Sequence, residues 1–446
     1  MKYAITSALF LSGISAVASG QNKPSKYDSR PNIVLIMADD LGYSDIGAYG
    51  SEIKTPNLDK LASQGVRFRE FYNNSISAPT RASLITGQYS HKAGVGYFDT
   101  NLGLPAYQGY LNRESVTFAE VLKGAGYSTL MSGKWHVGND SLSWPNQRGF
   151  EKYYGIIGGA SNYFDTDSLP FGDKPYPVAL VKNNVRQHPK PNSYYFTNEI
   201  AANAVEFLDE QNKTDKPFFL YVAFNAPHWP LQALPEDIAK YKGRYDIGWD
   251  SLRTERIARQ KQLGILLPGQ VVSKRDPEVP YWNKLTYEEQ QFWKRKEEVF
   301  AAMIDNMDQN IGKILAKIKE QGKEDNTIVI FLSDNGSQGG FSSTHLLNRG
   351  QVKNAGPIGT AGSFEYLEQP WAAVGNTPFR QYKNNMHEGG FRAPFIVRFP
   401  NKIKNGGTIV KGTGHIIDLA PTFYELAKAT SADGKKASNS TYVNID

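Results

Sequence analysis

The feature of this sequence that most restricts its fold is an apolar run that ends in two aspartates. Residues Asn32 to Met37 read NIVLIM, a largely β-branched run that stops at Asp39 and Asp40. A strand that is apolar at successive positions is buried on both faces, as in a parallel sheet covered by helices. The run therefore predicts a buried strand within an α/β fold.

The same pattern, an apolar strand followed by polar residues, occurs three more times. These strands end near Lys134 and His136, near Asn225 and His228, and at Asp334 and Asn335. Helical patterns lie between them, including a short helix from Thr117 that stops at a glycine and an apolar stripe from Phe300 to Ile318. This alternation predicts a large, mostly parallel (mixed) sheet sandwiched by helices. Because ligands of open α/β sheets bind beyond the carboxyl ends of the strands, the four polar endings predict one shared site.

Composition excludes several classes of function. The 446-residue chain is 40% hydrophobic and 21% charged, which supports a sizeable core and argues against disorder. It has no cysteine, so disulfides, thiolate metal sites and cysteine nucleophiles are excluded. The net charge of +6 is dispersed, without the basic block of a nucleic-acid track, and mildly favours anionic substrates.

The N-terminus has the pattern of an export signal. Lys2 precedes an apolar stretch from Ala4 to Ala18, and Ala16-Val17-Ala18 is a small-x-small cleavage site. We expect a signal peptide at 1–18, a polar leader at 19–30, a catalytic domain at 31–429 and a polar tail at 430–446. The mature protein is then periplasmic or secreted; the alternative is an N-terminal anchor that is never cut.

Two acidic pairs at strand ends suggest a metal site. Asp39 with Asp40, and Asp334 with Asn335, offer hard oxygen ligands from two strands, which suit Ca²⁺ or Mg²⁺. Adjacent carboxylates also repel each other unless a cation or a proton intervenes. The alternative for each residue is helix capping, a common role of Asp and Asn.

The segment SAPTRASLITG, residues 77–87, combines a hydroxyl with a helix start. Pro79 suits the first turn of a helix, which places Ser77 at or just before its beginning. The helix dipole favours an anion there, and Arg81 lies four residues further on. Ser77 is then a nucleophile beside an anion site, or only the cap of the helix.

Further cationic and histidine side chains follow the predicted strands. Lys134 and His136 are two residues apart, which in an extended segment puts both on one face. His228 lies between Pro227 and Pro230, and Lys383 precedes a glycine pair, Gly389-Gly390, which we expect to permit a sharp turn into a strand. The charged segment from Leu231 to Trp293 and the Tyr-rich stretch at 97–111 are expected to shape the pocket.

Taken together, these motifs resemble the type I sulfatases of the alkaline phosphatase superfamily, in particular their bacterial arylsulfatase branch. The resemblance runs from Pro31 to about Ala429. It rests on ordered motifs: NIVLIMADDLGYSDIGAYG, SAPTRASLITG, GYSTLMSGKWHVG, NAPHWPLQA, LSDNG, HEGGFRAPFIV and HIIDLAPTFYELA.

The resemblance implies a nucleophile, a metal and a catalytic shell. In this family a formylglycine (3-oxoalanine) forms from Cys or Ser within Cys/Ser-x-Pro-x-Arg, which here is Ser77, through a radical-SAM maturase. The matching ligands of one Ca²⁺ per chain are Asp39, Asp40, Ser77, Asp334 and Asn335. The matching sulfate and catalytic residues are Arg81, Lys134, His136, His228 and Lys383.

The resemblance also implies how these groups divide the work. Asp334 serves as base for a hydroxyl of the aldehyde hydrate, and His228, supported by Lys383, protonates the leaving oxygen. His136 helps take the proton of the second hydroxyl, while Arg81 and Lys134 neutralise sulfate oxygens.

One departure and two rival functions accompany the resemblance. Family members usually continue past DLAPT into a smaller C-terminal subdomain, which we expect to be absent or truncated here.

The rivals to a sulfuric ester hydrolase of aryl sulfates or sulfated glycans are a phosphatase or phosphonate monoester hydrolase of the same superfamily, and a secreted sulfated-ligand-binding protein without catalysis. No nucleic-acid partner and no stable membrane span after signal cleavage are expected.

Overall fold

A computed structural model describes residues 30–167, 169–171, 174–175, 179–189, 193–339 and 354–430. The expected signal peptide, the leader apart from Arg30 and the tail beyond Thr430 lie outside these residues. Within them, no helix combines the length and the apolar character that crossing a membrane requires.

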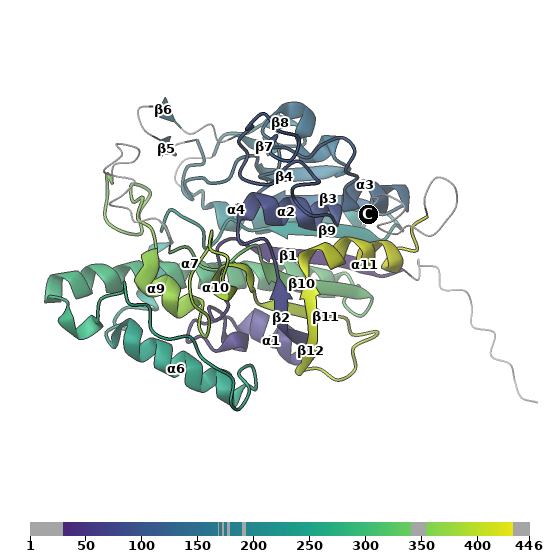
Figure 1. The fold of residues 1–446 in the computed structure, drawn as a ribbon. Helices are drawn as coiled ribbons and strands as arrows, with labels where there is room; N and C mark the ends of the chain where they lie inside the picture. The colour runs from purple at the N-terminus through teal and green to yellow at the C-terminus, as the bar shows by residue number, and fades with distance from the viewer. Residues whose placement is uncertain are drawn as a thin grey trace, which may run out of the picture.

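The centre of the molecule is a mixed ten-stranded sheet (Figure 1). In spatial order its strands are β12 (Thr408–His415), β2 (Val66–Tyr72), β11 (Phe395–Arg398), β10 (Thr327–Ser333), β1 (Asn32–Ala38), β9 (Phe218–Ala223), β3 (Ser128–Gly133), β4 (Lys152–Ile156), β7 (Leu180–Lys182) and β8 (Val185–Arg186). The central strands from β10 to β4 are parallel, whereas β11, β7 and β8 pair antiparallel to their neighbours. A separate pair, β5 (Pro170–Phe171) and β6 (Lys174–Pro175), lies outside this sheet. The predicted α/β class is confirmed.

Strand β1 shows why the sheet is covered on both faces. All of its residues are buried, and successive side chains point to opposite sides. Val34 and Ile36 join a core with α1 (Pro56–Gln64), α4 (Phe196–Gln211) and α7 (Tyr287–Glu320). Ile33 and Leu35 join a second core with α2 (Ser77–Thr86), α3 (Phe118–Gly124) and α11 (Leu419–Leu426), of which α2 and α11 cross the sheet in Figure 1.

Both helices predicted between the strands are present. Helix α3 begins at Phe118, and its N-cap, Thr117, forms a capping box with Glu120. The apolar stripe from Phe300 to Ile318 lies on α7, but this helix already begins at Tyr287, where Thr286 and Glu289 form another capping box. The last residues of the charged segment from Leu231 to Trp293 are therefore the first turns of a core helix.

The rest of that segment folds as α5 (Pro235–Ala239), α6 (Gly248–Gln262) and the short turn η4 (Trp282–Lys284). Its indole rings form a cluster with α9 (Glu368–Gly375): the ring centroid of Trp249 lies 4.7 Å from that of Trp282 and 5.5 Å from that of Trp371. Figure 1 shows α6 and α9 together at the lower left, beside the sheet. This aromatic cluster holds the segment as a side layer of the fold.

Candidate active site

The register of the sheet brings the polar strand endings together. Ala38 of β1 pairs with Ser333 of β10, so the next residues, Asp39 and Asp334, leave adjacent strands at the same level. Gly133 of β3 pairs with Ala223 of β9 at the same edge, which places Lys134 there too. The prediction that these strand endings share one site is supported by this geometry.

Ser77 is the first residue of α2, and its side chain does not cap the helix. The residue before the helix is Ile76, in an extended conformation, and no side-chain cap is present. Ser77 is almost fully buried, and its Oγ lies 3.1 Å from Asp39 Oδ1 and 3.2 Å from Asn335 Oδ1. The capping interpretation of Ser77 is therefore wrong, because its hydroxyl is directed at the acidic strand ends.

Three buried cations pair with three buried carboxylates around Ser77. Lys134 Nζ lies 2.5 Å from Asp39 Oδ2, Lys383 Nζ lies 2.7 Å from Asp40 Oδ1, and Arg81 Nη2 lies 2.9 Å from Asp334 Oδ2. Each charge is taken out of water, so it is stable only when paired and hydrogen-bonded. The formal charges of these six groups cancel.

Two of the carboxyl groups have pKa values that diverge. Burial would raise the pKa of Asp39, but the charges of Lys134, His228 and Arg81 lower it to about 2. Burial and the charge of Asp39 raise the pKa of Asp334, and its cationic neighbours offset this only in part. Such divergence is how two similar carboxyls take different roles in one site.

His228 reaches the site from the loop after β9. Its Nδ1 lies 2.7 Å from the carbonyl oxygen of Trp229, so Nδ1 carries the proton. Its Nε2 then faces the site, 3.6 Å from Asp40 Oδ2, and its side chain is 13% exposed. Burial lowers the pKa of His228, although the nearby carboxylates oppose the shift.

His136 reaches the same region by a different backbone path from the one expected. Its φ of 60° is left-handed, so the extended-segment argument that placed it on the same face as Lys134 is wrong. Its Nδ1 is buried without a hydrogen-bond partner among the described residues. Burial, with the charge of Lys134 next, lowers its pKa well below the usual value. A buried, unpartnered ring nitrogen at such a site is a functional signal.

Lys383 lies in a loop that positions it, and the glycine pair that follows does not form the sharp turn that was expected. Its backbone N–H donates to the carbonyl of Ser337 at 3.2 Å. Gly389 and Gly390 lie inside the short helix α10 (Glu388–Phe391) rather than in a sharp turn. A Cβ on Gly390 would lie 2.3 Å from the carbonyl oxygen of Asn385, so the glycines permit close backbone packing.

Sequence reasoning missed the residues that support this site. Tyr163 Oη lies 2.8 Å from the carbonyl oxygens of both Asn225 and His228, and these contacts position the loop that carries His228. Asp45 accepts hydrogen bonds from the Gly42 amide and the Ser337 hydroxyl, and pairs with Arg256 of α6 at 2.6 Å. The proximity of Asp45 to Asp39 in sequence was a usable signal, but nothing in the sequence marked Tyr163.

The acidic strand ends fit a hard divalent cation. Ligand atoms of Asp39, Asp40 and His228 lie within 4.8 Å of one another. Asn335 donates from Nδ2 to Asp40 Oδ1 at 2.6 Å, which leaves its Oδ1 directed toward Ser77. Carboxylate, amide and hydroxyl oxygens are the donor set that Ca²⁺ prefers.

Comparison with known proteins agrees with this geometry. A family model described as Sulfatase matches residues 31–429. The chain is 36% identical over 411 residues to an arylsulfatase of Klebsiella aerogenes, covering 89% of this chain and 87% of the relative. It is 37% identical over 421 residues to a sulfatase of Schizosaccharomyces pombe, with 90% and 75% covered. The crystal structure of Ps i-CgsB superposes with a TM-score of 0.63 at 29% identity, covering 91% of this chain and 73% of that one.

Proposed function

This chain belongs to the sulfatase family, and we propose that it cleaves aryl sulfates or sulfated glycans with an aldehyde made from Ser77 and one bound calcium ion. It is a sulfatase by its family and relatives; the substrate, the modified residue and the ion are what we propose.

The observation that carries the proposal is the position of Ser77. Its side chain is buried among Asp39, Asn335 and the cations that pair with the acidic strand ends, at the start of a helix. An unmodified serine hydroxyl is a weak nucleophile, and no histidine is within hydrogen-bond distance of Ser77 Oγ among the described residues to act as its base. The aldehyde, as its hydrate, supplies a more acidic hydroxyl there.

The charges of the site support a cation and an anionic substrate together. Asp39, Asp40 and Asp334 are balanced by Arg81, Lys134 and Lys383, so the site without an ion is neutral. Calcium, when bound by the acidic strand ends and Ser77, supplies a Lewis acid and two positive charges. The site then attracts the single negative charge of a sulfate monoester.

The side chains divide the remaining work. Arg81 and Lys134 hold the sulfate oxygens, and Asp334, whose pKa is raised, accepts a proton from the attacking hydroxyl. His228 directs Nε2 into the site, and in its imidazolium form, with Nδ1 still donating to the Trp229 carbonyl, it delivers the Nε2 proton to the leaving oxygen, with Lys383 beside it. His136 accepts the proton of the second hydroxyl of the hydrate, and loss of this proton allows the product sulfate to leave.

Relatives indicate the substrate class. They include an arylsulfatase of Klebsiella aerogenes and, at 27% identity, an N-acetylgalactosamine-6-sulfatase of Rattus norvegicus. The solved structures include Ps i-CgsB in complex with a neocarrahexaose at 28% identity and a TM-score of 0.62. We therefore propose sulfated glycans as the natural class and aryl sulfates as test substrates. The signal-like N-terminus supports export, and Ser77 in its motif supports modification by a radical-SAM maturase.

The test is mass spectrometry of the Ser77 peptide after co-expression with a serine-type maturase. We expect the peptide to lose two hydrogens, and aryl sulfate turnover to appear with the modification and to disappear in EDTA. Full turnover by protein with an unmodified Ser77 would show that the aldehyde is not required.

A pair of serine variants on α2 separates chemistry from folding. Ser77→Ala should lower turnover by at least about a thousandfold, as loss of a nucleophile does in other hydrolases. Ser83→Ala, which removes only an acceptor for Asn74 on the same helix, should leave turnover near that of the unmutated enzyme. Equal losses in both variants would assign the effect to the helix.

A further inference from the structure

A cavity lined by several charged side chains lies beside the segment that carries Lys383. Its volume is about 370 Å³, and it is bounded by α6, residues 273–277, Ala373 of α9 and residues 379–382. Four of its lining side chains are cationic and one is acidic: Arg253, Lys274, Arg275, Arg380 and Asp276. We call this cavity the α6–α9 cavity.

Three of the four cations lack a carboxylate partner. Arg275 pairs with Asp250 at 2.8 Å. Arg253 instead donates to the carbonyl oxygen and hydroxyl of Ser273, at 2.8 and 2.9 Å. Lys274 and Arg380 have no ion pair with any carboxylate of the part of the chain that the structure describes; Arg380 Nη2 lies 3.4 Å from His387 Nδ1. The cavity therefore holds an excess of positive charge.

The acidic residue of the cavity does not cancel this excess. Asp276 accepts a hydrogen bond from the hydroxyl of Tyr382 and forms no ion pair with Arg253, Lys274 or Arg380. Burial lowers the pKa of Arg253, and the interactions with Tyr382 and Asp250 offset this only in part. An anion bound within hydrogen-bond distance would stabilise a guanidinium in this state.

One short segment of the chain borders both the cavity and the active site. Tyr382 lines the cavity, whereas the next residue, Lys383, extends to Asp40. Two hydrogen bonds join the cavity wall to this segment. The Ser273 amide donates to the carbonyl of Pro378, and the Tyr382 hydroxyl donates to Asp276. The cavity and the active site thus lie against the same short stretch of chain.

We propose that the α6–α9 cavity is a second anion-binding site, which takes a sulfate or carboxylate group carried on a polyanionic glycan. Planar guanidinium groups and an ammonium group match the oxygens of such an anion. Phe379 and Pro277, which also line the cavity, offer an apolar surface to a sugar ring. The choice of a glycan as the carrier rests on the proposed function, whereas the anion site itself rests on the unpaired cations.

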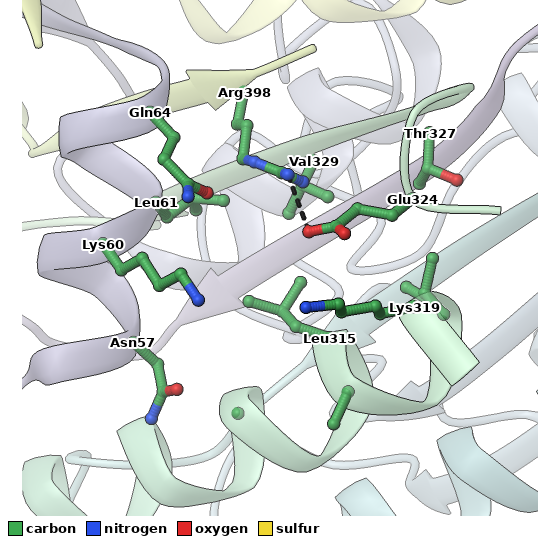
Figure 2. Close-up of a pocket in the computed structure, with 13 residues that line it drawn as sticks. Asn57, Lys60, Leu61, Gln64, Leu315, Lys319, Glu324, Thr327, Val329 and Arg398 are labelled. Carbon is green, nitrogen blue, oxygen red and sulfur yellow. Dashed lines mark hydrogen bonds and ion pairs between the residues drawn. The ribbon is translucent and has the colours of Figure 1, made fainter. Parts of the chain in front are cut away.

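A cavity at the amino end of β10 provides a matched control. It has a volume of about 190 Å³ and lies where β10 begins, at Thr327, away from the catalytic strand ends. Figure 2 shows Lys60 and Lys319 extending into it and Arg398 paired with Glu324. Removing two lysine charges there changes the net charge as much as removing Lys274 and Arg380.

The experiment compares two double variants by titration with a dextran sulfate oligomer, with neutral dextran as the negative control. Lys274→Gln/Arg380→Gln should weaken dextran sulfate binding by about tenfold or more, since a lost charge-assisted hydrogen bond corresponds to at least that factor. Lys60→Gln/Lys319→Gln should bind as the unmutated protein does. Arg253→Gln provides a third variant with the same expected loss.

Two results would overturn the proposal. Equal losses in the two double variants would show a general effect of net charge, and no loss in the α6–α9 variants would show that the cavity binds no glycan. Inorganic sulfate serves as a third probe: if it alone binds with the same dependence on Lys274 and Arg380, the cavity is a site for a free anion. Turnover of a small aryl sulfate by each variant should stay unchanged, so a failure of the proposed catalysis is seen separately.

Discussion

Asp39 and Asp334 are equally buried, yet their pKa values move in opposite directions. Asp39 is paired with Lys134 and stays ionised, with a pKa of about 2, which suits a permanent ligand of a cation. The pKa of Asp334 is raised by its burial and by Asp39, which suits a group that takes up a proton. At the scale of single residues, the neighbours of each carboxyl group decide which task it can perform.

The role of His228 can be tested through the leaving group. His228→Gln should lower kcat/KM by about 10² to 10⁴ for sulfate esters of phenols with a high pKa, because these need a proton on the departing oxygen. For esters of nitrophenols the loss should be much smaller. The measurement is turnover across a series of aryl sulfates.

The control for this series is His91→Gln, which removes an exposed ring that contacts Tyr107. It should leave the dependence on leaving group unchanged. A His228 variant that loses the same factor for every ester would contradict the assignment of His228 as the acid.

The proposed metal ligands are tested by a neutral replacement. Asp40→Asn removes a charge that pairs with Lys383 at 2.7 Å, and it should weaken calcium binding by at least about tenfold. Isothermal titration of EDTA-treated protein measures this. Asp59→Asn, which makes the same charge change beside Thr55 on α1, should bind calcium with unchanged affinity; equal affinity in the Asp40 variant would contradict the ligand assignment.

At the scale of secondary-structure elements, helix and turn starts differ in whether a side chain caps them. Helix α2 starts at Ser77 without using that side chain as a cap, which leaves the hydroxyl free for the acidic strand ends. In contrast, the turn η5 (Ile416–Asp418) is capped by a ring: His415 Nδ1 accepts from the amide of Ile417, and Asp418 bonds back to the His415 amide.

This cap makes a prediction about pH. Burial lowers the pKa of His415, and Asp418 opposes the shift only in part. Because its folded-state pKa lies below the unfolded value of about 6.5, the His415 contribution to stability is present above that value and is lost as the pH falls through the folded-state pKa. Between pH 8 and pH 5.5 the unmutated protein should lose more unfolding free energy than His415→Asn, whose cap does not titrate. Urea unfolding at both pH values checks this, and identical losses would rule out the ring as the cause.

At the scale of the whole molecule, helices far apart in the chain are joined by buried polar groups. Asp308 of α7 accepts hydrogen bonds from the amides of Asn57 and Leu58, at 3.0 and 2.8 Å, in the first turn of α1. Burial raises its pKa to about 6, so the hydrogen bonds compensate the cost of this buried carboxylate only in part.

Removing Asp308 should therefore destabilise the fold. Asp308→Ala leaves the amides at the start of α1 without an acceptor and should lower the unfolding free energy by about 2–4 kcal/mol, measured by urea denaturation. Asp209→Ala, which breaks an exposed pair with Lys317 and an exposed hydrogen bond from Gln321, should cost less than about 0.5 kcal/mol. A loss in the Asp308 variant no larger than in this control would show that the cap contributes nothing.

Sequence alone was sufficient for the elements whose signal is local. The apolar run of β1, the stripe of α7 and the short helix after Thr117 each follow from the period or the chemistry of a few neighbouring residues. The strand endings at Asp39, Lys134, His228 and Asp334 were visible for the same reason. The alternation of strands and helices then determined the α/β class, because strands buried on both faces need helices on both sides.

Only the tertiary structure decided which polar groups meet and how. The register of β1 with β10, the left-handed backbone of His136 and the hydrogen bonds of Tyr163 all depend on contacts between segments far apart in the chain. A strand end, a helix start and a loop each carry one part of the site, and no part specifies its distance from the others. The sequence thus determined the types of groups available, whereas burial in a shared core determined their distances, charges and protonation.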